Sequence, residues 1–72
     1  MLNKNKDKTR KELGEKIRKA QEKTGLTQAD VAVKAGVDVS YYAQIERGEV
    51  NPSLDKLQNI AEVLKLKTLD IL

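Results

Sequence analysis

The chain has 72 residues, carries a formal net charge of +3, and contains neither cysteine nor histidine. A chain of this length forms one domain and buries only about 60% of its unfolded surface, so its core must be small. Without cysteine and histidine it lacks the usual metal ligands and the imidazole acid–base group, which argues against a metal centre and against an enzyme. The sequence offers no nucleotide-binding glycine motif either, and we expect no cofactor.

The N-terminal segment "MLNKNKDKTRKEL" has no apolar core of a signal peptide, and no apolar run approaches the ~18 residues of a membrane span. We therefore expect a cytoplasmic protein without membrane contact. Nine basic residues against four acidic ones give residues 1–23 a charge of +5, which leaves −2 for the rest. This basic third either helps to hold a polyanion or forms a solvated helix face.

Residues 1–8 are polar and lysine-rich without periodicity, and we interpret them as a flexible basic N-terminal arm that precedes a domain over residues 9–72. Thr9 and Glu12 form a capping-box pattern that predicts a helix start. Apolar residues then recur at helical spacing, at Leu13, Ile17 and Ala20. Gly25 predicts the end of this helix.

Two short helices are predicted next. Thr27 and Asp30 form a second capping pattern, and Gly36 ends a helix of about two turns. Asp38 can cap the following helix, which turns Tyr42 and Ile45 inward until Gly48 stops it.

Asn51-Pro52 predicts a turn, after which Ser53 caps a fourth helix. Its apolar residues are Leu54, Leu57, Ile60, Ala61 and Leu64. Thr68 can cap a last turn that holds Leu69, Ile71 and Leu72. Since no segment alternates with a period of two, the fold class is all-α with five short helices.

The second and third predicted helices are joined by a tight turn at Gly36, which is the helix-turn-helix arrangement. In that motif the second helix can lie in the major groove of DNA. The first helix of the motif, predicted between Thr27 and Gly36, is too short to do more than brace the second helix of the motif.

At these residues the chain resembles the phage repressor/Cro-like family of helix-turn-helix regulators, the xenobiotic-response-element type. The stretches that carry the resemblance are "TGLTQADVAVKAGV" (24–37), "IERGEVNPSLDKL" (45–57) and "IAEVLKL" (60–66). The resemblance covers about residues 10–72 and rests on several motifs in the same order and spacing. It implies a lambda-repressor-like DNA-binding domain in which helices 2 and 3 form the motif.

The resemblance implies a set of DNA-binding residues: Gln28, Lys34, Val39, Ser40, Tyr41, Gln44, Arg47 and Asn51. Gln28 matches a glutamine that meets a phosphate and the third helix. Gln44 is the strongest candidate for reading a base, because a carboxamide pairs bidentately with adenine. Arg47 matches an arginine that contacts a phosphate. For Gln28, Val39, Ser40 and Gln44 the alternative is an ordinary solvent-facing side chain.

The two tyrosines stand side by side and take different roles. Tyr42 matches a core position, so we expect a buried ring whose hydroxyl reaches the rim. Tyr41 then points outward, where it either touches the sugar–phosphate backbone or covers a neighbouring helix.

The chain departs from the family pattern in two ways. The first-helix arginine that pairs in the family with the glutamate at position 46 is replaced by Gln21, so we expect a neutral hydrogen bond in place of an ion pair. Residues 38–51 carry a charge of −2, which is unusual for a surface that approaches phosphates.

The function that follows is a sequence-specific transcriptional regulator, a repressor, that binds a short palindromic operator in double-stranded DNA as a homodimer. The apolar C-terminus supplies the expected dimer interface: Val63, Leu66, Leu69, Ile71 and Leu72. Core closure is the alternative role of these residues. The alternative function is an antitoxin or adaptor that uses the same fold to bind a protein partner. With nothing after Leu72, we expect no sensor domain and no small-molecule ligand.

Overall fold

The computed structural model describes residues 2–67 of the chain. These residues form four helices and the loops that join them. They are α1 (Leu2–Thr24), α2 (Gln28–Ala35), α3 (Val39–Glu46) and α4 (Leu54–Val63). No strand occurs in this part of the chain, so the all-α prediction is confirmed for it. The described part has four helices where five were predicted for the whole chain, and the fifth, predicted over 68–72, lies outside the described residues.

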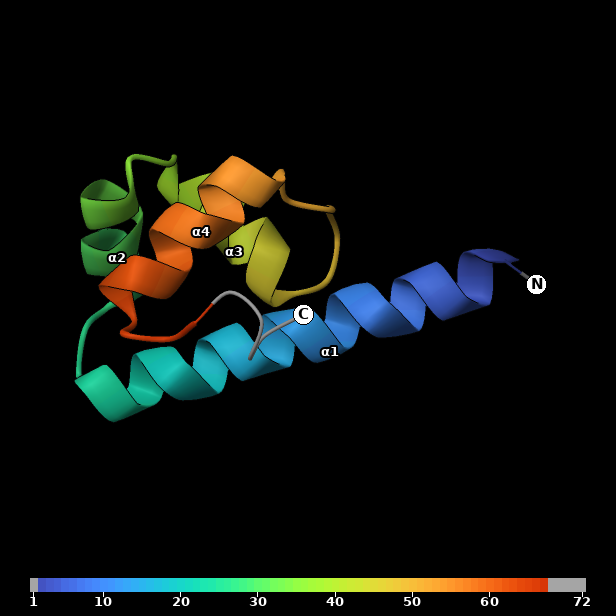
Figure 1. Ribbon diagram of the computed structural model, residues 1–72, viewed down its shortest axis with the longest axis horizontal. Helices are drawn as coiled ribbons and strands as arrows, with labels where there is room; N and C mark the ends of the chain where they lie inside the picture. Colours follow the sequence, from blue (N-terminus) through green and yellow to red (C-terminus); the bar gives the residue numbers. More distant parts are fainter. Residues whose placement is uncertain (1, 68–72) are drawn as a thin grey trace.

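Helix α1 begins earlier than the sequence predicted. Its backbone is helical from Leu2 onward, so the helix start predicted at Thr9 is wrong, and residues 2–8 are helical where a flexible arm was predicted. Lysine, leucine and arginine favour helix, and no glycine or proline interrupts residues 2–13, so the helix continues past the capping pattern. Figure 1 shows its N-terminal turns extending beyond the other helices. The boundary between arm and domain at residue 9 stays a prediction.

Two of the three caps predicted for the later helices of the described part make their side-chain bonds. The Thr27 hydroxyl accepts a bond from the Asp30 amide at 3.1 Å, and the Asp30 carboxylate accepts one from the Thr27 amide at 3.0 Å, which completes the capping box. The hydrogen bonds from Thr27 lower the pKa of Asp30. Ser53 accepts from the Lys56 amide at 3.3 Å. Asp38 occupies the N-cap of α3 but makes no capping bond with its side chain.

A tight turn joins α2 to α3. Gly36 adopts a left-handed conformation with φ of 73°, which a residue without a Cβ takes at little cost. Its amide and that of Val37 donate to the carbonyls of Val33 at 3.2 Å and Ala32 at 2.9 Å, so the last turn of α2 keeps its hydrogen bonds. The chain then enters α3, which packs against both α2 and α1, while α4 packs against α2.

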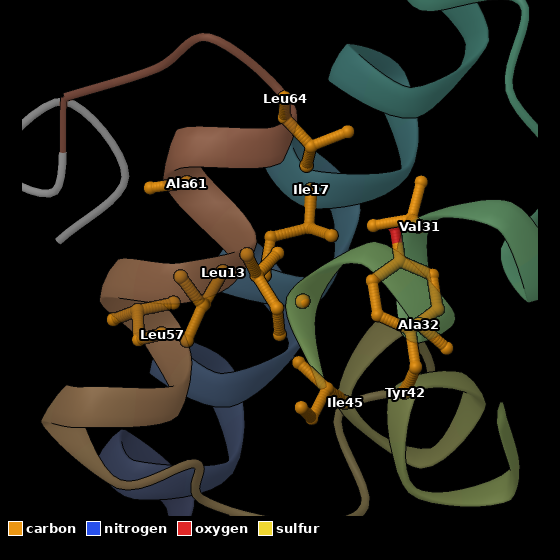
Figure 2. Packing of buried hydrophobic residues seen from close by; sticks show 11 residues of the cluster. Leu13, Ile17, Val31, Ala32, Tyr42, Ile45, Leu57, Ala61 and Leu64 are labelled. Atoms are coloured by element: carbon orange, nitrogen blue, oxygen red, sulfur yellow. The ribbon is translucent and has the colours of Figure 1, made fainter. Parts of the chain in front are cut away.

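One hydrophobic core joins all four helices. Its members are Leu13, Ile17, Val31, Ala32, Ala35, Tyr42, Ile45, Leu57, Ile60, Ala61 and Leu64. In Figure 2 the side chains of Leu13 and Ile17 from α1 meet those of Ile45 and Leu57 from the other side. Tyr42, Ile17 and Ile60 have no exposed surface, so the core position predicted for Tyr42 is confirmed. Burial of this cluster holds helices of eight residues that would not be stable alone.

Two glycines let α1 approach the end of α3 closely. A Cβ atom at Gly14 would overlap the carbonyl of Glu46 and lie 2.5 Å from that of Ile45. A Cβ at Gly48, where φ is 74°, would lie 2.7 Å from the Cγ of Lys11. Both glycines are buried. The position of the C-terminal end of α3 is therefore fixed by backbone contact with α1.

Candidate nucleic-acid interface

Helix α3 presents polar side chains on one face. Ser40, Gln44 and Arg47 follow one another at intervals of four and three residues, so they share a side of the helix. Ser40 and Arg47 are exposed and Gln44 is half-buried. Val39, at the start of the helix, keeps 42% of its surface exposed. These residues form an accessible strip that begins at the turn of the motif.

Gln28 opens α2 and contacts the end of α3. It is exposed, and its Nε2 donates a hydrogen bond to Oε1 of Glu46. The contact with the third helix that the resemblance implied for this glutamine is therefore present. The phosphate contact of Gln28 stays a prediction. In the protein alone, the bond ties the first residue of α2 to the last residue of α3.

Gln21, Tyr42 and Glu46 form a small polar cluster at the edge of the core. The Tyr42 hydroxyl donates to Oε1 of Gln21 at 3.1 Å, so the neutral bond made by Gln21 goes to the tyrosine. Oε2 of Glu46 is buried and accepts no hydrogen bond. Burial raises the pKa of the Tyr42 phenol well above its usual value, and the neighbouring Glu46 carboxylate raises it further.

Arg47 is held by a carboxylate of its own loop. Its Nε donates to Oε2 of Glu49 at 2.7 Å and its Nη2 to Oε1 at 3.1 Å. This bidentate bond raises the pKa of Arg47 and lowers that of Glu49. At least half of each side chain is exposed, so the pair is weak in water. A phosphate would occupy the same two donors.

Tyr41 lies between the core and α4. Its half-buried ring packs against the core cluster, and Nζ of Lys56 stands 4.8 Å from the ring centroid. This packing agrees with the role of covering a neighbouring helix, one of the two weighed for Tyr41, and contact with DNA stays a prediction. Lys56 was not among the residues predicted from the sequence. The sequence does contain a signal for it. Lys56 lies three residues after the cap Ser53, at the position where a capping box has an acidic residue.

The remaining predicted DNA-binding residues, Lys34 and Asn51, lie outside α3. Lys34 is exposed in the last turn of α2, and Asn51 is exposed in the loop between α3 and α4. Of the predicted dimer interface, Val63 and Leu66 are partly buried against the core. Leu69, Ile71 and Leu72 lie outside the described residues.

Other kinds of site find no support in residues 2–67. None of their helices combines the length and apolar character needed to cross a membrane. Nor do the described residues bring three or more potential ligands among His, Cys, Asp and Glu together around a metal position. The fold and the exposed strip on α3 define a helix-turn-helix domain, with α2 bracing and α3 presented outward.

Comparison with known proteins agrees with this class. The family model described as helix-turn-helix matches residues 17–72, and the chain belongs to that family. The HTH-type transcriptional regulator DdrOP3 of Deinococcus deserti is 37% identical over 60 residues, which cover 83% of this chain and 46% of the relative. The immunity repressor protein of Bacillus phage phi105 is 38% identical over 55 residues, 76% of this chain and 38% of the relative.

The chain spans less than half the length of these two regulators. A solved structure of similar size is the restriction-modification controller protein C.AhdI from Aeromonas hydrophila. It superposes with a TM-score of 0.84 at 28% identity, covering 88% of this chain and 96% of that protein. The shared fold thus includes nearly the whole of the controller protein.

The unpartnered oxygen of Glu46 predicts that Gln21→Arg stabilises the fold. Arginine would supply a charged donor to this oxygen, and such bonds contribute about 1.5–3 kcal/mol. Urea denaturation of the wild type, Gln21→Arg, Glu46→Gln and the double variant measures the coupling energy. We expect a coupling of about 1–2 kcal/mol. Additive effects of the two substitutions would contradict the proposed pairing.

The buried phenol of Tyr42 predicts a loss of stability at alkaline pH. The unfolded phenol ionises near pH 10, whereas the folded phenol keeps its proton because its pKa is raised. The unfolded state then binds fewer protons, so the free energy of unfolding falls as pH rises, by about 1 kcal/mol at pH 11. The measurement is the difference in unfolding free energy between wild type and Tyr42→Phe at pH 8 and pH 11. A difference independent of pH would contradict the assignment.

Proposed function

We propose that this chain is a sequence-specific DNA-binding transcriptional regulator that acts as a repressor by occupying a short operator. The observation that carries the proposal is the accessible strip on α3, formed by Ser40, Gln44 and Arg47 behind the turn of a helix-turn-helix. The names of the relatives, which are a transcriptional regulator and an immunity repressor, support it.

In this proposal α3 lies in the major groove and its polar strip meets the base edges. The Gln44 carboxamide pairs with N6 and N7 of an adenine, Ser40 accepts several bases, and Val39 contacts a thymine methyl. Gln44 is half-buried, so its side chain loses less freedom on binding than that of a fully exposed residue.

Two further contacts fix the helix on the DNA backbone. Gln28 acts at the N-terminus of α2, where its bond to Glu46 also holds α3 in place. Arg47 contacts a phosphate after exchanging the Glu49 carboxylate for it. Lys34 and Asn51 are weaker phosphate contacts from exposed positions.

The regulator acts as a homodimer on a palindrome. One helix of this size reads about four or five base pairs, and a dimer doubles this when its half-sites lie about 34 Å apart. The proposed dimer interface includes Val63 and Leu66, which are partly buried against the core, together with Leu69, Ile71 and Leu72. We propose the cytoplasm as its location. The relatives named above give no support to the antitoxin or adaptor alternative.

The test is selection of binding sites from a random pool of duplexes, followed by titration of the best site at two salt concentrations. We expect a palindrome bound by two protomers far more tightly than random DNA. Failure to enrich any sequence, with only weak salt-sensitive binding, would overturn the proposal. A stoichiometric protein partner recovered without DNA affinity would favour the adaptor alternative.

The two main residues of the strip have different expected roles. Gln44→Ala should cost about 1–3 kcal/mol on the best site and relax the choice of base at one position. Arg47→Ala should weaken binding similarly on all sequences and reduce the salt slope. Fluorescence anisotropy on operator and random duplexes separates these effects. Equal losses for both variants on both duplexes would refute the assigned roles.

The carboxylate on Arg47 predicts that Glu49→Gln strengthens DNA binding. Removing the competitor frees both guanidinium donors, and we expect an affinity gain of about two- to fivefold on operator and random DNA alike. Glu62→Gln, the same charge change on the last turn of α4, is the matched control. The gain should vanish when Glu49→Gln is made together with Arg47→Ala. A gain that survives in the double variant would mean that Glu49 acts by general repulsion.

A further inference from the structure

The first turn of α4 carries a cation that local helix chemistry disfavours. Lys56 is the third residue of this helix, close to the positive end of the helix dipole, where a basic side chain is destabilising. Asp55 beside it has the favourable sign. A residue that contradicts a local rule calls for a compensating contact or a function.

The compensating contact comes from α3. Nζ of Lys56 stands 4.8 Å from the centroid of the Tyr41 ring, within the range of a cation–π interaction. Tyr41 is the third residue of α3, and its ring also packs against the core cluster. The ring is therefore fixed by packing and offers the ammonium group a rigid platform.

The charge of Lys56 is otherwise uncompensated. Among the described residues no carboxylate forms an ion pair with it, whereas Arg47 is held by Glu49 and Lys19 by Glu15. The side chain of Lys56 is exposed, so its ammonium group stays accessible while the ring limits its motion. A cation held in this way loses little conformational entropy when an anion arrives.

The position of the Tyr41 ring on α3 indicates which anion the ammonium group of Lys56 would meet. Tyr41 directly follows Ser40 and lies one turn before Gln44 on α3, so the ammonium group lies beside the strip proposed to read bases. When a helix lies in the major groove, the sugar–phosphate backbone borders it on both sides.

We propose that Lys56, held on the ring of Tyr41, is a further contact to a DNA phosphate at the side of α3. The inference rests on the proposed function and adds to it a cation from α4. It also changes the role of Tyr41, whose ring positions Lys56 and whose hydroxyl is not needed for binding.

The test compares Lys56→Gln with Lys16→Gln, the same charge change on an exposed residue of α1. The dependence of log Kobs on log salt is measured on the selected operator and on random duplex. Each lost phosphate contact reduces the slope by about 0.9. We expect that loss per protomer for Lys56→Gln on both duplexes, with the selected sequence unchanged. A slope equal to that of Lys16→Gln would overturn the proposal.

Variants of Tyr41 separate the platform from a direct contact. Tyr41→Phe keeps the ring and should bind as the wild type does, whereas Tyr41→Leu should weaken binding and make a further Lys56→Gln change less costly. Circular dichroism checks that each variant is folded. If Tyr41→Phe weakens binding as much as Tyr41→Leu, the hydroxyl itself contacts DNA and the platform role is wrong.

These outcomes remain distinct from failure of the proposed function. If the wild type selects no operator and binds no duplex, the regulator proposal fails together with this inference. If the wild type binds an operator, Gln44→Ala relaxes its specificity, and Lys56→Gln matches its control, only the phosphate contact of Lys56 is refuted.

Discussion

The structure depends on the packing of α3 against the middle of α1. Helices of eight residues, such as α2 and α3, have too few internal hydrogen bonds to be stable alone. Their orientation is therefore set by tertiary contacts, first by the buried side chains of Ile17 and Tyr42. At Gly14 the approach is so close that a methyl group would overlap the backbone of α3. A helix positioned by backbone contact has little freedom to tilt, and a helix that reads bases needs this rigidity.

Much of this arrangement is local and could be predicted from the sequence. The Thr27–Asp30 box, the left-handed Gly36 and the cap at Ser53 each depend on a few adjacent residues, so the later helices were found close to their observed bounds. The start of α1 was missed for a related reason. A capping pattern at Thr9 resembles a helix start, but without a breaker upstream it does not stop a helix that already extends from Leu2.

The contacts of the candidate site could not be predicted in the same way, because each joins residues far apart in the sequence. The Tyr42 hydroxyl donates to the side-chain oxygen of Gln21, and Oε2 of Glu46 has no donor. The sequence indicated that an arginine was missing at position 21 but not which neighbour would bond to the glutamine. The pair of Tyr41 and Lys56 depends on the angle between α3 and α4, which no local motif encodes.

These contacts also bear on the negative charge of residues 38–51. Residues 38–51 carry a charge of −2, yet Arg47 is held in a defined position by Glu49, and Lys56 by the ring of Tyr41. Few positive charges give weak nonspecific binding, because counterion release scales with the number of phosphates neutralised. If the chain acts as proposed, its affinity has to come from contacts made in the correct register. The negative charge of residues 38–51 would then oppose binding to random DNA, which favours specificity over strength of binding.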